Sequence, residues 1–87
     1  MKIKQFEWNK GNADHIARHH VNPEETEEVF IGKTKLFRSK NKRYVCLGKT
    51  LSGRYLFVVF MRKLRGLIRV ITARDMTHKE RRLYDKK

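Results

Sequence analysis

The sequence predicts a small α+β domain in which helices pack against a curved antiparallel sheet. From residue 34 onward, apolar residues recur with a period of two in four segments joined by short turns, as antiparallel strands require. Before them, two segments carry helix-start signals and apolar residues at helical spacing. At 87 residues the chain leaves room for a single domain, spanning 1–87.

The first elements are expected to be a short strand, Ile3 to Trp8, and a helix capped by Asn9. The helix places four residues on one apolar stripe: Ala13, Ile16, Ala17 and His20. The stripe predicts that His20 packs against the core and that the helix ends near this residue. A histidine at 78, in contrast, would begin a later helix and face solvent.

A second helix starts at Asn22-Pro23, where asparagine is the cap, proline takes the first helical position and Glu25 completes a capping box. It is short and acidic and is expected to bury Val29 and Phe30. The strands then follow as Lys35–Arg38, Arg43–Thr50, Arg54–Lys63 and Leu67–Arg74. A second capping box, Thr77 to Glu80, opens a terminal helix that has only Leu83 and Tyr84 to bury, so this helix must dock or be ordered by a partner.

The strand Arg54–Lys63 is apolar on both faces, which predicts a central strand covered from both sides. Its apolar run, Tyr55 to Met61, is far shorter than the roughly 18–20 residues of a membrane-spanning helix. No secretory signal is recognisable at the N-terminus. A single cysteine, Cys46, cannot form an internal disulfide and is expected to be a core residue, so a reducing, cytoplasmic location is expected.

Charge is strongly segregated along the chain. Residues 1–31 hold four basic and six acidic side chains, whereas residues 32–87 hold eighteen basic and three acidic ones, for a total of +13. An excess confined to one region favours a polyanionic partner. RNA, DNA and an acidic protein all fit this requirement, and an anionic membrane fits it least.

Arginines inside the last strand point in the same direction. Strict alternation places Arg69 on one face, with Leu67, Ile71 and Ala73, and Arg74 on the other, with Ile68, Val70 and Thr72. Desolvating an arginine is unfavourable without an anion, and acids are scarce in this region, so we expect the anion to come from outside the chain as phosphate. Arg43 and Arg54 begin neighbouring strands and are expected to line the same concavity. The alternative for any one of them is a surface arginine that shields a sheet edge.

Motifs for metal or covalent chemistry are missing. The sequence has no phosphate-binding glycine loop, no pair of CxxC elements and no plausible Ser-His-Asp set. His15 and His19 have the spacing of a zinc pair, but no third ligand follows at a convincing distance, so neither a metal nor another cofactor is expected. His19 is a candidate acid–base group, or equally a residue that ends the helix. RNA carries its own nucleophile, the 2′-OH, and arginine, lysine, histidine and tyrosine can promote its attack without a metal.

The chain resembles the BrnT toxin family of type II toxin–antitoxin systems over residues 6 to 84. The resemblance rests on FEWNKGNADHIARHHVNPEETEEVF, RYVCLGKTLSGRYLFVVF and IRVITARDMTHKERRLY. Its most specific parts are Gly48-Lys49-Thr50 followed by Gly53-Arg54, and Thr72-Ala73-Arg74 followed by Glu80-Arg81 and Tyr84.

The resemblance implies a RelE-like fold and a metal-independent endoribonuclease that cleaves mRNA. It also implies neutralisation by a BrnA-type antitoxin, here with an acidic docking surface, and contact with operator DNA only through the toxin–antitoxin complex. Arg18-His19 matches the family motif after the first helix, but His20 replaces the usual glycine, which weakens a catalytic role for His19. The family residues Arg43, Arg54, Arg69, Arg74 and Tyr84 match without departure.

The preferred hypothesis is therefore a ribonuclease toxin. Arg69 and Arg74 would grip the scissile phosphate with help from Arg43 and Arg54. His19 or Tyr84 would move protons, and Lys49, Lys79 and Arg82 would hold flanking phosphates. Two alternatives remain: a non-catalytic RNA- or ribosome-binding module, and an interaction protein whose basic face only docks an acidic partner.

Overall fold

The computed structural model describes residues 5–86. In chain order the elements are β1 (Gln5–Glu7), α1 (Lys10–Ala17), α2 (Pro23–Val29), β2 (Lys35–Arg38), β3 (Arg43–Lys49), β4 (Tyr55–Arg62), β5 (Leu67–Asp75) and α3 (His78–Asp85). A single 3₁₀ turn, Leu64–Gly66, connects β4 to β5. Residues 3 and 4 of the expected first strand lie outside the described residues.

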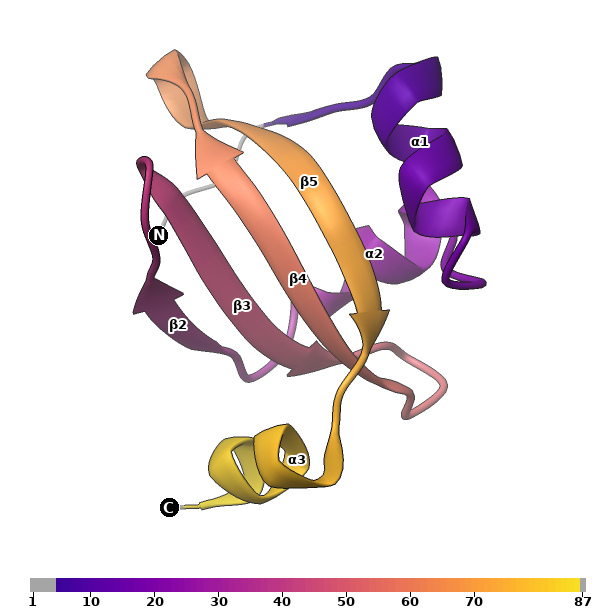
Figure 1. Cartoon of the computed structure of the whole chain (residues 1–87), viewed down its shortest axis with the longest axis vertical. Coiled ribbons are helices and arrows are strands. Elements are labelled where there is room, and N and C mark those ends of the chain that lie inside the picture. Colours follow the sequence, from indigo (N-terminus) through magenta and orange to yellow (C-terminus); the bar gives the residue numbers. More distant parts are fainter. Residues whose placement is uncertain (1–4, 87) are drawn as a thin grey trace.

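One five-stranded sheet, in the order β1-β5-β4-β3-β2, forms the centre of the molecule (Figure 1). Strands β2 to β5 are antiparallel neighbours in chain order, because only short turns connect them. The first strand, β1, instead pairs in parallel with β5. Parallel neighbours need a long connection, and here all the other strands and the first two helices lie between them in the sequence. The α+β class is confirmed, with a mixed sheet, and β4 lies at its centre as predicted.

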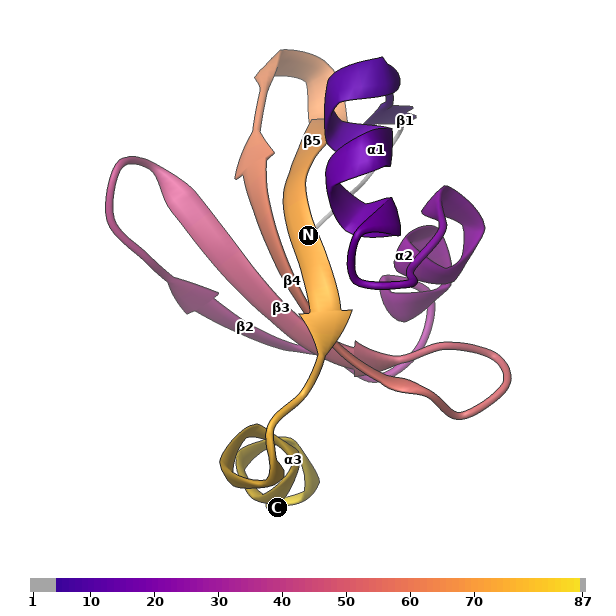
Figure 2. The same ribbon diagram turned by 45° about the vertical axis from the view of Figure 1, so that its right-hand side comes forward.

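Helices α1 and α2 cover one face of the sheet, and α3 lies apart from them beyond the end of β5 (Figure 2). The main core between the sheet and the first two helices consists of Ile16, Val21, Val29, Cys46, Leu56, Val58, Phe60, Ile68, Val70 and Ala73. On the other face a smaller cluster, Leu47, Met76 and Tyr84, forms beneath α3. That face is therefore covered at only one end, so the predicted cover on both sides of β4 is incomplete.

All three predicted caps are present with both hydrogen bonds of a capping box, at Asn9, Asn22 and Thr77. The buried Asn12 does more than cap. Its amide nitrogen also donates to the carbonyl oxygens of Glu7 at 2.9 Å and Val70 at 3.0 Å, and so ties α1 to β1 and β5. Cys46 is fully buried as expected, and burial raises the pKa of its thiol to about 12.

The expected packing of His20 is wrong. His20 is exposed and its φ is +60°, a left-handed conformation. The amide of His20 donates to the carbonyl of Ala17, and the amide of Val21 donates to the carbonyl of Ile16. These two bonds form a Schellman motif, which ends α1 and turns the chain toward α2.

Among the described residues, no helix is long and apolar enough to cross a membrane.

Candidate functional site

A β-bulge in β5 changes the faces that its side chains occupy. Val59 of β4 pairs with Thr72, but the next residue, Phe60, pairs with Val70. Ile71 is therefore an extra residue without a partner on β4. An extra residue shifts the alternation by one position, so side chains before and after it no longer follow a strict period of two.

Because of the bulge, Arg69 and Arg74 lie on the same face of the sheet, and the prediction of opposite faces is wrong. Arg69 pairs with Met61 and Arg74 pairs with Phe57, and these two β4 residues share the face that α1 and α2 leave open. Arg43 of β3 pairs with Met61 from the other side. We call this set of Arg43, Arg69 and Arg74 the arginine face.

Arg74 lies at the end of the arginine face nearest α3. Its Nη1 and Nη2 atoms donate to the two carboxylate oxygens of Glu80, each at 2.9 Å, and the guanidinium lies 3.9 Å from the centroid of the Phe57 ring. This ion pair lowers the pKa of Glu80 and raises the pKa of Arg74. The side chain of Arg74 is still 33% exposed, so its outer edge remains accessible to a ligand.

Arg69 shares a carboxylate with a neighbouring lysine. Its Nη1 donates to Glu7 at 3.1 Å, and Lys63 donates to both oxygens of the same carboxylate at 2.9 and 3.2 Å. Hydrogen bonds from Lys63 and then from Arg69 lower the pKa of Glu7. The third member of the arginine face, Arg43, is exposed.

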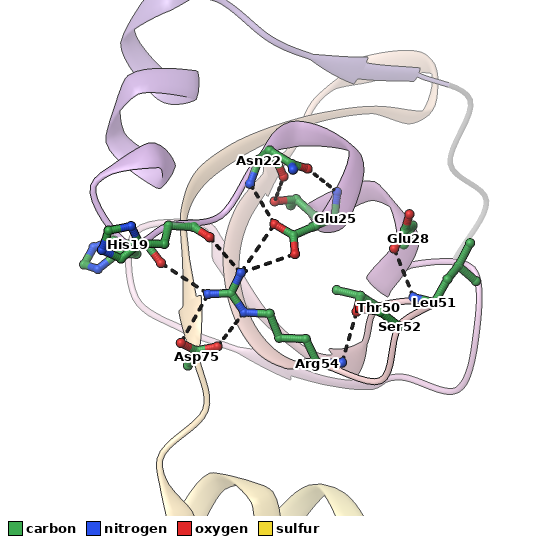
Figure 3. A network of polar contacts seen from close by, with 11 residues as sticks. His19, Asn22, Glu25, Glu28, Thr50, Leu51, Ser52, Arg54 and Asp75 are labelled. Atoms are coloured by element: carbon green, nitrogen blue, oxygen red, sulfur yellow. Dashed lines mark hydrogen bonds and ion pairs between the residues drawn. The ribbon is translucent and has the colours of Figure 1, made fainter.

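Arg54 forms a separate network at the other end of the sheet (Figure 3). Its Nε and Nη2 donate to the carboxylate of Asp75 at 2.7 and 3.2 Å. Its Nη1 donates to the carbonyl of His20 at 2.7 Å and reaches Glu25 at 3.3 Å, and Nη2 also donates to the carbonyl of His19 at 3.3 Å. Asp75 raises the pKa of Arg54, and in return the pKa of Asp75 is lowered.

The predicted concavity shared by Arg43 and Arg54 is wrong. Arg43 pairs with Met61 at one end of the β3–β4 hairpin, whereas Arg54 precedes Tyr55, which pairs with Lys49 at the opposite end. Antiparallel neighbours begin at opposite ends of a sheet, so the first residues of two adjacent strands lie far apart.

The expectation that the arginines lack an anion within the chain is also wrong for three of them. Arg54, Arg69 and Arg74 each contact at least one carboxylate: Glu25 and Asp75, Glu7, and Glu80 respectively. Two of these acids belong to the acidic N-terminal region, more than twenty residues away along the chain. Such pairs are decided by the fold, and no sequence spacing indicates them.

His19 follows α1 and its side chain is exposed. Its ring lies edge-on to that of His15, with 5.9 Å between centroids, and outside the Arg54 network in Figure 3. Its carbonyl oxygen, bound by Arg54, fixes the backbone beside Asp75. Within residues 5–86, no group of three or more histidine, cysteine or acidic side chains is arranged to hold a metal ion.

Tyr84 is buried on the inner side of α3, where its hydroxyl donates to the carbonyl of Lys33 at 2.8 Å. This hydrogen bond anchors the helix, and burial raises the pKa of the hydroxyl. The three lysines and arginines expected to bind flanking phosphates, Lys49, Lys79 and Arg82, are exposed. Lys49 lies 5.2 Å from the centroid of the Tyr55 ring, beside the docked end of α3.

Comparison with known proteins finds similarity both to a family model and to solved structures. A family model described as "Ribonuclease toxin, BrnT, of type II toxin-antitoxin system" matches residues 8–80. The crystal structure of the Brucella abortus ribonuclease toxin BrnT is similar to this chain, with a TM-score of 0.69 and 19% sequence identity over 85% of this chain and 97% of that one. At this identity the similarity shows the fold. A comparison with curated proteins finds no match.

Proposed function

Because the chain belongs to the BrnT family of ribonuclease toxins of type II toxin–antitoxin systems, we propose that it cleaves mRNA without a metal ion. The observation that supports this proposal best is the arginine face, in which Arg43, Arg69 and Arg74 lie on the same open surface of the sheet. Arginine presents a planar fork that matches phosphate oxygens, and three such groups can stabilise the charge of a pentacoordinate phosphate.

The proposed reaction uses the nucleophile that RNA supplies. A base removes the proton of the 2′-OH, the 2′-oxygen attacks the adjacent phosphorus, and the bond from phosphorus to the 5′-oxygen of the next nucleotide breaks. The leaving 5′-oxygen takes up a proton, so the products are a 2′,3′-cyclic phosphate and a 5′-hydroxyl. The charge on the phosphoryl oxygens is largest in the transition state, where pre-positioned arginines contribute most.

The residues have different parts in this proposal. Arg69 and Arg74 bind the scissile phosphate with help from Arg43. The exposed ring of His19 carries a proton; because His19 follows α1 on the covered side of the sheet, this role requires the RNA to pass the end of β5 where Asp75 lies. Arg54 is a positioning residue, since its guanidinium joins the backbone of His19 to Asp75, the residue after Arg74.

Tyr84 is proposed to position α3, because its hydroxyl is already bound to a carbonyl in the described structure. The exposed Lys49, Lys79 and Arg82 hold phosphates on either side of the cleaved bond. Glu80 occupies the fork of Arg74 in the free protein, so RNA must compete with this carboxylate for the guanidinium.

The proposed partner is a BrnA-type antitoxin. Residues 32–87 have an excess of fifteen positive charges, so an inhibitor that covers the arginine face should be acidic where it docks and should bind with strong salt dependence. Covering Arg69 and Arg74 would inhibit without any change in fold. Contact with operator DNA would then come through the antitoxin. We also propose that the fold is related to that of RelE-like toxins.

The first test is RNA cleavage in the presence of EDTA. We expect the purified protein to cleave RNA with chelator present and to leave DNA of the same sequence intact, because DNA lacks the 2′-OH. Mass spectrometry of the products should show the cyclic phosphate. Cleavage that stops with EDTA and returns with Mg²⁺ would refute this mechanism, and RNA binding without cleavage, with or without ribosomes, would favour a non-catalytic binding module.

A second experiment separates transition-state stabilisation from binding. Arg74→Lys keeps the charge but loses the fork, so the saturated cleavage rate should fall by roughly 10²-fold or more while RNA affinity changes little. Lys79→Ala should weaken binding and leave the saturated rate nearly unchanged. Lys10→Ala, an exposed lysine at the start of α1, is the control. If Arg74→Lys behaves like Lys79→Ala, then Arg74 only tethers RNA.

A further inference from the structure

A pocket lies between two hairpin turns, at the end of the sheet opposite α3. Its volume is about 1020 Å³, and its lining consists of Arg38, Ser39, Lys42, Arg43, Tyr44, Arg62, Lys63, Leu64 and Leu67. Figure 1 shows these two turns, β2–β3 and β4–β5, at the same end of the molecule. Five of the lining residues are basic and, among the described residues, none of them is acidic. We call this cavity the turn pocket.

The turn that supplies Lys42 is built at a conformational cost. Asn41 and Lys42 both have positive φ, +59° and +61°, and the amide of Arg43 donates to the carbonyl of Lys40. This is the pattern of a type I′ turn, in which glycine is strongly preferred at the second central position. This left-handed conformation is sterically unfavourable for a lysine, because its Cβ approaches the following carbonyl oxygen. The chain therefore keeps a positive charge at the rim of the turn pocket where glycine would stabilise the hairpin better.

The apolar side of the turn pocket is also unusual. Leu64 is 88% exposed in the free protein although it lines the cavity, and Leu67 and the ring of Tyr44 are half-buried beside it. Arg62 lies 5.7 Å from the centroid of the Tyr44 ring. A small inorganic anion would gain nothing from contact with this apolar surface. A nucleotide, in contrast, presents a phosphate together with a flat, mostly apolar base.

We propose that the turn pocket binds one nucleotide of single-stranded RNA on one side of the cleaved bond, with its phosphate on Arg38 and Lys42 and its base against Leu64 and Tyr44. This inference rests on the proposed function, which it extends with a second contact region. Arg43 belongs to both the pocket and the arginine face. Its strand lies two strands from that of Arg69, roughly 10 Å away. Tyr44 pairs with the core residue Phe60 and Arg38 pairs with Tyr44, so both lie on the sheet face opposite Arg43. One RNA strand would therefore run along the arginine face from Arg74 and bend around the β2–β3 end of the sheet into the turn pocket.

The test measures binding apart from cleavage. The probe is a short single-stranded RNA with 2′-O-methyl groups throughout, which cannot be cleaved by attack of the 2′-oxygen. Fluorescence anisotropy over a range of salt concentrations gives the affinity and its salt slope. The charge variant is Lys42→Gly, which also relieves the strained turn, and its matched control is Lys40→Ala, whose side chain in the same turn does not line the pocket. The apolar variant is Leu64→Ser, and its control is Leu51→Ser, which changes another exposed turn leucine.

For Lys42→Gly we expect affinity to fall by at least ~3-fold and the salt slope to decrease by about 0.7, while the thermal midpoint rises. For Leu64→Ser we expect a loss of affinity with an unchanged salt slope, because no phosphate contact is removed. Both controls should bind as the unmodified protein does. A stabilised Lys42→Gly protein with unchanged RNA affinity would overturn the proposal. The proposal would also fail if Lys42→Gly and Leu64→Ser weakened binding of the antitoxin but not binding of the RNA probe.

Failure of the proposed function gives a different result. If the unmodified protein binds the probe through the turn pocket but cleaves no natural RNA, the catalytic proposal fails and the pocket stands. If it cleaves RNA and Lys42→Gly cleaves with an unchanged KM, the catalytic proposal stands and the pocket inference fails.

Discussion

His20 occupies the left-handed position of the Schellman motif at the end of α1, where a glycine would meet no steric penalty. The side chain is exposed and the backbone carbonyl accepts a hydrogen bond from Arg54. His20 therefore contributes to the fold through its backbone conformation and its carbonyl group, and not through its side chain. A histidine here destabilises the turn slightly and leaves an imidazole close to His19.

Replacing His20 with glycine tests whether its left-handed backbone destabilises the fold. His20→Gly should raise the free energy of unfolding by about 0.5–1 kcal/mol, because the left-handed conformation no longer opposes a Cβ. Urea denaturation measures the change. Arg18→Gly, in the same segment but at φ −63°, is the control and should lower stability by up to about 1 kcal/mol. Equal effects of both substitutions would show that the backbone of His20 is not strained.

At the scale of the elements, close contacts decide how the helices lie on the sheet. Gly48 of β3 lies directly under the end of α2, and a Cβ at this position would be 2.7 Å from Cγ1 and 2.9 Å from the carbonyl oxygen of Val29. The terminal helix α3 is held instead by side chains. Tyr84 binds the carbonyl of Lys33, and the Nζ atom of Lys35 donates to the carbonyl of Leu83 at 2.6 Å and to that of Lys86.

The contact beneath α2 gives a prediction with an internal control. Gly48→Ala should lower the free energy of unfolding by about 1–3 kcal/mol, since α2 must move away from β3. Gly32→Ala introduces the same methyl group where no atom lies within 4 Å, and it should be neutral or slightly stabilising. Thermal or urea denaturation of the two variants measures the difference. Similar losses in both would indicate that backbone freedom, rather than the contact with Val29, explains the requirement for glycine.

At the scale of the whole molecule, ion pairs join segments that are distant in sequence. Arg54 links the turn after α1, the start of α2 and the end of β5. Glu7 links β1 to β5 through Arg69 and to the β4–β5 turn through Lys63. These carboxylates also reduce repulsion within a chain of net charge +13. Losing their charge should weaken the fold.

Acid titration tests this contribution. Hydrogen bonds from Arg54 and Arg74 lower the pKa of Asp75 and Glu80, so these carboxylates stabilise the fold above their ordinary pKa and stop doing so as the pH falls through the lowered values. Stability should therefore decrease between about pH 5 and about pH 2. Asp75→Asn should cost about 0.5–1 kcal/mol at neutral pH and reduce the acid loss, because Asp75 is largely exposed.

The control for the titration is Glu24→Gln, which changes an exposed acid on α2 and should leave the pH profile unaltered. Urea midpoints measured at a series of pH values give the comparison. An acid loss that is as steep in Asp75→Asn as in the unmodified protein would mean that other carboxylates dominate.

Local signals predicted most of the elements well. Asn9, Asn22 and Thr77 cap helices as expected, because a capping box satisfies backbone amides within four residues of chain. Alternating apolar residues located the strands, since a half-buried strand must place one side chain in two against the core. The site was harder to predict: Arg69 and Arg74 were expected on opposite faces and without an anion in the chain, whereas they share a face and each binds a carboxylate.

The sequence by itself determined the α+β class, the caps, the basic character of the C-terminal region and the membership of Arg69 and Arg74 in one strand. Only the tertiary structure decided that these two arginines share a face, because a bulge at Ile71 depends on how β5 pairs with β4. It also decided that Arg54 contacts Glu25 and Asp75. Capping and alternation act within a few residues of chain, whereas register and ion pairing depend on segments brought together by folding.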